Sequence, residues 1–234
     1  MDYIYDLHVH SKECSHCASS ALTDMVRAYK KAGYAGFVIT NHFLRGCNCV
    51  PAELDWAGKM HCYWDTYTEA KKVADELDFD LLFGIEECYG MAQEVLIYGI
   101  DLDFLLANPD MCEIPIEQLC ERVREYGGFS SHAHPFRERD YIPKNYKRMD
   151  ISALDGLEIY NASNGDNESN RKAEELMRQS GLKFTAGSDN HNVRTLENGN
   201  VGGLIFNRRM RTSAELCDAL RSGEGRVYKK EQDR

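Results

Sequence analysis

Short β-rich runs alternate with helix-like stretches along almost the whole chain, and this alternation restricts the fold more than any other feature. In chain order the segments read YIYDLHVH, LTDMVRAYKKAG, FVITNH, TYTEAKKVADELD, LLFGIEE, EVLIYGI, IEQLCERVREYG, FSSHAH, GLEIYN, SNRKAEELMRQSG, FTAGSDNH, GGLIF and AELCDALRSG. Several helical stretches end in a glycine that suits a left-handed C-cap, as at Gly33, Gly127 and Gly181. Alternation of this kind predicts a parallel α/β sheet or barrel. Six or seven such units favour a closed or nearly closed barrel over a doubly wound sheet.

Length and charge limit the domain count and the partners. The 234 residues contain 43% hydrophobic residues, enough for a core, and no linker is visible. We therefore expect a single barrel domain over residues 1–228 and a charged, solvated tail, KKEQDR, over residues 229–234. The formal net charge of −10 argues against a general binder of nucleic acid or of membrane surfaces.

The cysteines and the absence of a membrane signal predict a cytoplasmic location. No apolar run approaches the length of a membrane span, and Asp2 and Asp6 stand where a leader would be basic and apolar. Nine cysteines, an odd number, fit free thiols in a reducing compartment better than a disulfide framework. The pairs Cys14-x-x-Cys17 and Cys47-x-Cys49 could hold a structural zinc, but we favour reduced, unpaired thiols because the second spacing is tight.

Almost every expected strand carries residues of metal-binding type at its carboxyl end. These residues are His8 and His10, His42, Glu86 and Glu87, His132 and His134, Glu158, and Asp189 and His191. Alternate residues of a strand face the same way, so His8 and His10 share a face. In a parallel barrel the carboxyl ends of the strands meet on one face, where active sites are built. Of the remaining histidines, His16 lies in the first loop and His61 lies elsewhere.

This set of side chains predicts a metal centre. Imidazole and carboxylate together suit Zn, Mn or Fe, and a carboxylate can bridge two ions. Two or three close cations lower the pKa of a bound water and clamp the oxygens of a phosphoryl group. A nucleophilic mechanism through Cys88 is the rival, and we disfavour it because no base pairs with Cys88 in the sequence.

Six motifs in a fixed order carry a family resemblance. DLHVHS, ITNH, GIE, AHPFR, GLEIYN and GSDNH resemble the successive motifs of the PHP (polymerase and histidinol phosphatase) family over about the first 190 residues. The last helix, followed by GRVY, also resembles the end of that family. The resemblance implies a distorted (β/α)7 barrel with two or three divalent metal ions and phosphoesterase activity.

The resemblance also assigns ligands by position. It implies one metal held by His8, His10, Glu86 and Asp189, a second by Glu86 and His134, and a third by His16, His42 and His191. Phosphatases of this family carry a histidine in the strand after GIE, whereas this chain reads EVLIYGI. The second site is therefore expected to be weaker, completed by water or assisted by His132.

Several neighbours of these ligands have expected roles. Asp189, His191 and Arg137 are the expected catalytic residues, and Arg137 would hold a substrate phosphate as a bidentate fork. Glu158 and Asn161 are expected to support the ligands or contact substrate, and Glu87 to point away from Glu86. Two loops are expected to define the substrate. They are residues 46–64, with Trp56, His61 and Trp64, and residues 137–150, with Arg137, Arg139, Lys144, Lys147 and Arg148.

The expected function is hydrolysis of a phosphomonoester by metal-activated water, on a small phosphorylated metabolite or a nucleotide. We expect no membrane partner, and nucleic acid only as a short oligonucleotide cleaved by phosphodiesterase or exonuclease action. A non-catalytic, metal-binding regulatory domain is the alternative that the missing histidine favours. Hydrolysis of a C–N or C–O bond is a third possibility, but such sites commonly use a lysine and no expected strand end offers one. The oligomeric state stays open.

Overall fold

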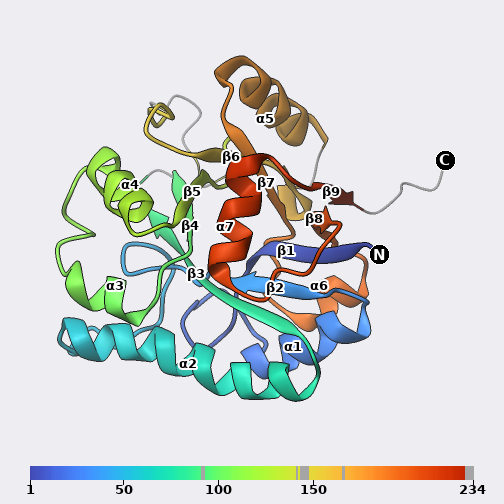
Figure 1. Ribbon diagram of the computed structural model, residues 1–234. Helices are drawn as coiled ribbons and strands as arrows, with labels where there is room; N and C mark the ends of the chain where they lie inside the picture. The colour runs from blue at the N-terminus through green and yellow to red at the C-terminus, as the bar shows by residue number, and fades with distance from the viewer. Residues whose placement is uncertain (91–92, 141, 143–147, 165–166, 230–234) are drawn as a thin grey trace.

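Nine strands form one mixed sheet in the computed structural model, which describes residues 1–90, 93–140, 142, 148–164 and 167–229. The strands are β1 (Tyr3–Val9), β2 (Gly36–Ile39), β3 (Asp80–Cys88), β4 (Glu94–Tyr98), β5 (Phe129–His132), β6 (Gly156–Asn161), β7 (Lys183–Gly187), β8 (Gly202–Phe206) and β9 (Arg226–Lys229). Their order in the sheet is β7-β6-β5-β4-β3-β2-β1-β8-β9 (Figure 1). The predicted charged tail begins at Lys229, the last residue of β9, and residues 230–234 lie outside the described residues.

The sheet curls into a nearly closed barrel, as predicted. Beyond the end of β7, Asn190 forms a parallel bridge with Val9 of β1. The backbone N–H of His10 donates to the carbonyl of Asn190 (2.9 Å), and that of Asp189 donates to the carbonyl of His8 (2.8 Å). The first and last strands of a seven-stranded barrel therefore meet at the end that carries His8 and His10, while β8 and β9 extend the other side of β1.

One of the seven barrel strands departs from the expected parallel arrangement, and outside the barrel β8 and β9 are antiparallel to β1 and to β8 respectively. β1, β2 and β3 are parallel, as are β5, β6 and β7, but β4 runs antiparallel to both β3 and β5. The reason is the short connection between β3 and β4, which makes a hairpin, whereas a parallel crossover needs a dozen or more residues. The amino end of β4 therefore lies beside the carboxyl ends of its neighbours.

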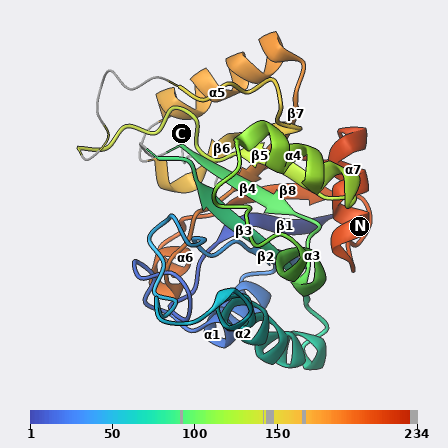
Figure 2. The ribbon, with the colours of Figure 1, turned by 90° about the vertical axis from the view of Figure 1, so that its left-hand side faces the viewer.

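Helices cover the barrel from several sides. They are α1 (Leu22–Lys31), α2 (Trp56–Glu76), α3 (Leu102–Ala107), α4 (Ile116–Glu125), α5 (Asn167–Ser180), α6 (Val193–Glu197) and α7 (Ser213–Ser222), with a 3₁₀ turn at Ala162–Asn164. In both views α1 and α2 lie on one side of the sheet and α5 on the opposite side (Figure 1, Figure 2). Within the described part of the chain, no helix is both long and apolar enough to cross a membrane.

Helix α7 packs on the barrel end opposite the predicted site. Its Leu216 and Leu220 are buried in one cluster with Leu82, Leu96 and other side chains of the barrel. Arg221 of α7 donates a hydrogen bond to the carbonyl of Gly128 (2.9 Å), directly before β5. The hydrophobic core thus fills this end and leaves the other end for polar groups.

Helix α2 corrects the prediction for residues 46–64. We expected a loop there, but α2 begins at Trp56, where the side chain of Asp55 caps it by accepting from the N–H of Gly58 (2.8 Å). Trp56 donates its indole N–H to the carbonyl of Leu105 (2.8 Å). Trp64 packs edge-to-face on Phe83, with 5.1 Å between ring centroids. Both indoles therefore pack between elements instead of forming a substrate loop.

Candidate metal centre

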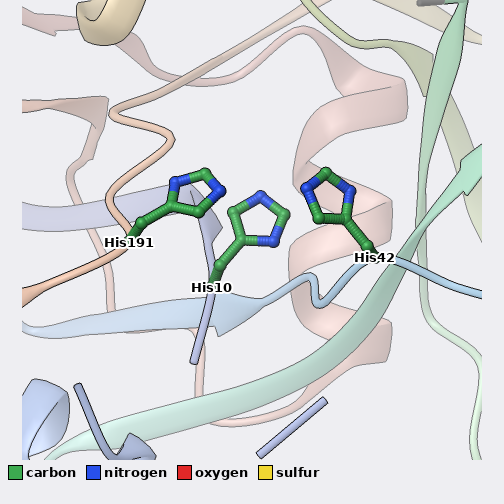
Figure 3. A group of neighbouring side chains, drawn as sticks. All are labelled: His10, His42 and His191. Atoms are coloured by element: carbon green, nitrogen blue, oxygen red, sulfur yellow. The ribbon is translucent and has the colours of Figure 1, made fainter. Parts of the chain in front are cut away.

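Histidine and carboxylate side chains from separate strand ends gather into one buried cluster. Four overlapping groups have ligand atoms within 4.8 Å of one another: His10, His42 and His191; His8, His134 and Asp189; His8, His10 and Glu86; and His42, Glu86 and Glu94. Figure 3 shows the rings of His10, His42 and His191 side by side, each carried by a different segment. Seven of the eight predicted ligands lie in these groups, and the eighth, His16, does not.

The two histidines of β1 share the site as their alternation predicts, with ring centroids 5.0 Å apart. Nδ1 of His8 lies 3.0 Å from Oε1 of Glu158, so Nε2 of His8 faces Glu86 (3.1 Å) and Asp189 (3.5 Å). A carboxylate behind a histidine fixes the orientation of its ring. Gly187 permits this arrangement, because a Cβ there would lie 2.4 Å from Cβ of His8.

Whether the cluster suits a metal can be judged from its buried nitrogen and oxygen atoms that lack hydrogen bonds. Nε2 of His8, Nε2 of His10, Nδ1 of His42 and Oε2 of Glu86 are buried and have no partner in hydrogen-bond geometry among the described residues. Nδ1 of His42 nevertheless lies 2.7 Å from Oε2 of Glu86. Buried polar atoms are almost always paired, so several unpaired ones around one point indicate lone pairs that are available to a cation. Imidazole nitrogen with carboxylate oxygen suits Zn, Mn or Fe, and the donor set fits such ions.

The electrostatics favour the metal-binding protonation state at His10 and Glu86 but not at every ligand. Burial works to lower the pKa of His8 and of His42, but the negative charges of Glu158 and Glu86 at His8, and of Glu86 at His42, raise both pKa values well above their usual value. Burial, together with the positive charges of His191 and His42, holds the pKa of His10 well below its usual value. Burial works to raise the pKa of Glu86, but the positive charges of His8 and His42 outweigh it and hold that pKa well below its usual value. A neutral imidazole and an ionised carboxylate are the forms that coordinate a cation.

Glu94 is the cluster residue that the sequence reasoning missed. Its Oε2 lies 3.3 Å from Nε2 of His134, and its Oε1 lies 3.8 Å from Nδ1 of His42. In the hairpin Leu96 pairs with Glu86, and Glu94, two residues earlier, faces the same way. Glu94 therefore supplies a carboxylate where EVLIYGI has no histidine. The available signal was this acidic residue at the amino end of an otherwise apolar strand.

Burial raises the pKa of the Glu94 carboxyl, and the negative charge of Glu86 adds to the effect.

His132 is not a member of these groups of possible ligands. Burial, with smaller contributions from the charges of His134 and Arg148, lowers the pKa of His132 to about 3. His132 is therefore a neutral, buried ring beside the cluster, and no contact among the described residues supports its expected help to a second metal.

Arg137 reaches the cluster from the loop after β5. It donates from Nη2 to Oδ2 of Asp189 (2.5 Å) and to Oδ1 of Asn161 (2.9 Å), and from Nε to Oδ1 of Asn164 (3.3 Å). Burial works to raise the pKa of Asp189, but the charges of Arg137 and His8 outweigh it and hold that pKa well below its usual value. The guanidinium of Arg137 thus contacts the edge of the cluster and is not exposed on a loop.

The other cationic residues of the loop at 137–150 make separate contacts or lie outside the described residues. Arg139 donates to the carbonyl oxygens of Ser163 and Asn164, and the guanidinium of Arg148 lies 4.0 Å from the ring centre of Phe136. Lys144 and Lys147 lie outside the described residues.

Glu87 points away from the cluster, as expected from strand alternation. It is fully buried and its Oε1 pairs with Nε of Arg45 (2.5 Å). Burial raises the pKa of Glu87 to about 7, against the opposing effect of Arg45.

His16 lies outside the groups of possible ligands in which it was expected. The side chain of His16 is exposed, and its backbone N–H donates to the carbonyl of Cys47 (2.8 Å). The thiol of Cys17 instead hydrogen-bonds with the side chains of His42 and His191. Burial works to raise the pKa of Cys17, but these hydrogen bonds outweigh it and lower the pKa to about 6.

Two residues of the cluster have left-handed backbone conformations. His134 has φ of 29° and Asp189 has φ of 58°, and Asp78 is the one other non-glycine residue with positive φ in the described ranges. Such conformations are costly for residues with a side chain and tend to occur where function requires a fixed position. Here they direct one imidazole and one carboxylate into the same group.

Comparisons with known proteins agree with this geometry. Residues 167–224, which include Asp189 and His191, match a family model described as PHP-associated. No curated protein matches the chain in sequence.

Three solved structures share the fold. A two-domain protein from Bacteroides vulgatus, containing a predicted PHP-like metal-dependent phosphoesterase, is 15% identical with a TM-score of 0.71; the match covers 97% of this chain and 65% of that one. A candidate metal-dependent phosphoesterase from Bifidobacterium adolescentis is 17% identical with a TM-score of 0.51, and the match covers 80% of this chain and 87% of that one. An amidohydrolase from Chromobacterium violaceum, with bound sulfate and no metal, is 16% identical with a TM-score of 0.56, over 80% and 87% of the two chains.

Fold and site together define a barrel of the PHP type with a buried cluster of possible metal ligands at one end. The resemblance carried by the motifs is thereby confirmed: residues 167–224 have a PHP-associated sequence pattern, and the chain has the fold of PHP-like proteins. The chain spans 65% of the length of the Bacteroides vulgatus protein, so the activity of that whole protein does not transfer to it directly.

Proposed function

We propose that this protein is a metal-dependent phosphoesterase that hydrolyses a phosphomonoester of a small metabolite or nucleotide. The observation that carries the proposal is the set of buried, unpaired nitrogen and oxygen atoms on His8, His10, His42 and Glu86, which converge at one end of a PHP-type barrel. We further propose two or three divalent ions, zinc, manganese or iron. Divalent ions at such a centre supply an activated water and neutralise charge on phosphoryl oxygens.

The ligand groups divide between the two sides of Glu86. Its Oε1 lies 3.1 Å from Nε2 of His8 and 3.2 Å from Nε2 of His134, and its Oε2 lies 3.4 Å from Nε2 of His10 and 2.7 Å from Nδ1 of His42. A carboxylate with each oxygen facing different imidazoles suits a bridge between ions. Glu94 contributes to the group on the His42 side.

Arg137 and His191 define the substrate side. Within the described part of the chain, Arg137 uses Nε and Nη2 for its hydrogen bonds, which leaves Nη1 for a phosphoryl oxygen. The side chain of His191 is 25% exposed, against 3% or less for those of His8, His10 and Asp189. The substrate therefore approaches from the side of His191, with its phosphate between Arg137 and the ligand groups. Asp189 links the two by accepting from Arg137 while it faces His8.

The structure gives less support to a non-catalytic domain and to C–N bond hydrolysis than to phosphoester hydrolysis. Phosphodiester cleavage can be tested directly. Glu94 weakens the case for a non-catalytic domain, since that case depended on the missing histidine. Hydrolysis of a C–N bond gains interest from the amidohydrolase of similar fold, but no lysine lies in the ligand groups of the described residues. Phosphodiester cleavage of short oligonucleotides uses the same groups, and only a substrate comparison separates it from monoester hydrolysis.

The nine free cysteines support a further proposal, that the protein works in a reducing compartment such as the cytoplasm.

The test is phosphate release from a panel of phosphomonoesters by protein reconstituted separately with zinc, manganese and iron. Short oligonucleotides and amide substrates serve as competing classes. His10→Ala and Asp189→Asn should abolish both turnover and metal binding while circular dichroism stays native. His61→Ala is the matched control, because His61 is half-exposed on α2 and, among the residues that the structure describes, pairs with Asp65 of the same helix. No turnover on any phosphoester with any metal would disprove the proposal.

A further inference from the structure

Glu158 of β6 is a buried carboxylate behind the metal cluster. Its side chain is fully buried, so it cannot touch a substrate, and within the described part of the chain it belongs to none of the groups of possible ligands. Oε1 of Glu158 lies 3.0 Å from Nδ1 of His8. Oε2 accepts from the backbone N–H of His134 (2.8 Å) and from Nδ2 of Asn161 (2.9 Å). Because a carboxylate only accepts, each of these partners has to donate a proton.

The contact with His8 determines which ring nitrogen is free for a metal. Nδ1 of His8 carries a proton and donates it to Glu158, so the lone pair that can bind a cation is at Nε2. Nε2 faces Oε1 of Glu86 (3.1 Å) and has no partner in hydrogen-bond geometry among the described residues. A Cβ at Gly187 would lie 2.4 Å from Cβ of His8 and 3.0 Å from Oε1 of Glu158, so both side chains pack closely on bare backbone.

The contact with His134 holds a costly backbone conformation. His134 has φ of 29°, which is a left-handed value. Its N–H donates to Oε2 of Glu158, and Nε2 of its ring lies 3.2 Å from Oε1 of Glu86. Glu158 therefore orients two predicted ligands, His8 through its ring and His134 through its backbone.

The contact with Asn161 extends from the ligands to Arg137. Oδ1 of Asn161 accepts from Nη2 of Arg137 (2.9 Å) and from the backbone N–H of Ser163 (2.9 Å). Only the oxygen of the amide can accept these bonds, so its NH2 group faces Glu158. Glu158 and Asn161 are three residues apart and would face opposite sides of a regular strand. The β6–β7 register shifts between Glu158 and Tyr160, as at a β-bulge, and this shift lets both side chains meet.

We propose that Glu158 is a positioning residue that fixes two metal ligands and the substrate-binding arginine together. The inference rests on the proposed metal centre and on the proposed role of Arg137, but not on turnover. One carboxylate selects the protonated nitrogen of His8, holds the backbone of His134 and, through Asn161, directs Arg137. The guanidinium is thereby fixed relative to the ligands.

Glu158→Gln tests the part of the proposal that concerns the ligands, because an amide cannot accept on both sides. With its NH2 group toward His8, it favours a proton on Nε2, where the proton blocks a metal. With its NH2 group toward His134 and Asn161, it faces two donors, and one of them is a backbone N–H that cannot turn. In either orientation zinc affinity of the full chain, measured by chelator competition, should fall by about 10–100-fold.

A double-mutant cycle tests the link to Arg137. In zinc-saturated protein, Glu158→Ala should weaken binding of inorganic phosphate, measured by isothermal titration, by about tenfold. Arg137→Ala should cost less in that background than in the wild type, because the arginine has already lost its support. Two costs that add would overturn the link. Asp80→Asn is the matched control, since Asp80 is a buried carboxylate paired with Arg209, and it should change neither affinity.

NMR of the zinc-loaded wild type provides a check that needs no variant. Long-range ¹H–¹⁵N correlations should show a proton on Nδ1 of His8 and zinc on Nε2. The opposite pattern would overturn the proposal. Unchanged zinc affinity in Glu158→Gln would also overturn it and leave the proposed function intact. Zinc binding by a wild type that hydrolyses no phosphoester with any metal would refute the proposed function alone, and a wild type that binds no metal would refute both.

Discussion

Arg137 donates a hydrogen bond to Oδ2 of Asp189, while Oδ1 of the same carboxylate faces Nε2 of His8 and of His10, at 3.5 Å and 3.2 Å. One carboxylate therefore links the guanidinium to the predicted ligands. This relationship places a permanent positive charge at the edge of the cluster, in a protein whose formal net charge is −10.

Replacing Arg137 should weaken substrate handling more than metal binding. Arg137→Ala should lower kcat/KM for phosphomonoesters by about ten- to a hundredfold, because a hydrogen bond to a charged group contributes about 1.5–3 kcal/mol. Metal content should stay at the wild-type level, since an arginine side chain cannot donate a lone pair to an ion. Steady-state kinetics and elemental analysis on the same preparations measure both. Arg178→Ala is the matched control, because Arg178 pairs with Glu174 on the exposed surface of α5. Wild-type kinetics for Arg137→Ala would refute its role.

Glu94→Gln should reduce metal binding. The substitution keeps the size of the side chain and removes the charge that faces His42 and His134, so bound metal per chain should fall or its affinity drop by about 10–100-fold or more. Isothermal titration with the proposed metals measures both quantities. Glu121→Gln, on the exposed side of α4, should bind metal as the wild type does. If Glu94→Gln also binds normally, the second site does not use this carboxylate.

Removing the metal should lower thermal stability. Ions that bind the folded chain and not the unfolded chain stabilise it, by about 2.7 kcal/mol at a free concentration one hundred times Kd. A chelator should therefore lower Tm, and adding back one of the proposed metals should restore it. His10→Ala should show no response to the chelator. An unchanged Tm in the wild type would mean that the folded chain has no linked metal site.

Arg209 should stabilise the fold without affecting the metal centre. It donates to both oxygens of the buried Asp80 (2.8 and 2.7 Å), whose Oδ2 also accepts from the hydroxyl of Tyr5 (2.5 Å). Arg209→Met leaves the Asp80 carboxylate without its charge partner and should cost about 1.5–3 kcal/mol of the free energy of unfolding. Each kcal/mol lowers Tm by about 2–4 °C in a domain of this size. Metal content should not change, and a loss of metal would contradict the separation of the two sites.

The stabilisation by Arg209 should also depend on pH. A hydrogen bond from Arg209, and then its charge, lower the pKa of Asp78 in the folded protein. Because the folded-state pKa lies below that of the unfolded chain, about 3.9, this stability is present above that pH and is lost as pH falls through the folded-state value. The Tm difference between the wild type and Arg209→Met should therefore narrow as pH falls below about 4. A difference that widens in acid would contradict this sign.

The sequence was sufficient to predict the barrel and most of the cluster, because both follow from one regularity. Parallel strands bring their carboxyl ends together, so His42, Glu86 and Asp189 could be expected at one face without any coordinates. The H-x-H of β1 followed from strand alternation in the same way.

What the sequence did not predict depends on exceptions to that regularity. β4 runs antiparallel, so its amino end lies at the site, and Glu94 is invisible to a search of carboxyl ends. The position of His16 outside the cluster depends on backbone hydrogen bonds to distant segments, such as that from the N–H of His16 to the carbonyl of Cys47, which no local pattern encodes. The start of α2 at Trp56 was missed because its first turns carry aromatic residues that also suit a binding loop.

Anomalous X-ray diffraction from crystals of the metal-loaded protein, recorded above and below the absorption edge of each bound metal, tests the central claim most directly. We predict two or three peaks, all within coordination distance of the ligand groups around Glu86, with one of them adjacent to His10, His42 and His191. Peaks found only at surface residues, or no peak in protein that retains native folding after loading with zinc, manganese or iron, would contradict the assignment of a metal centre.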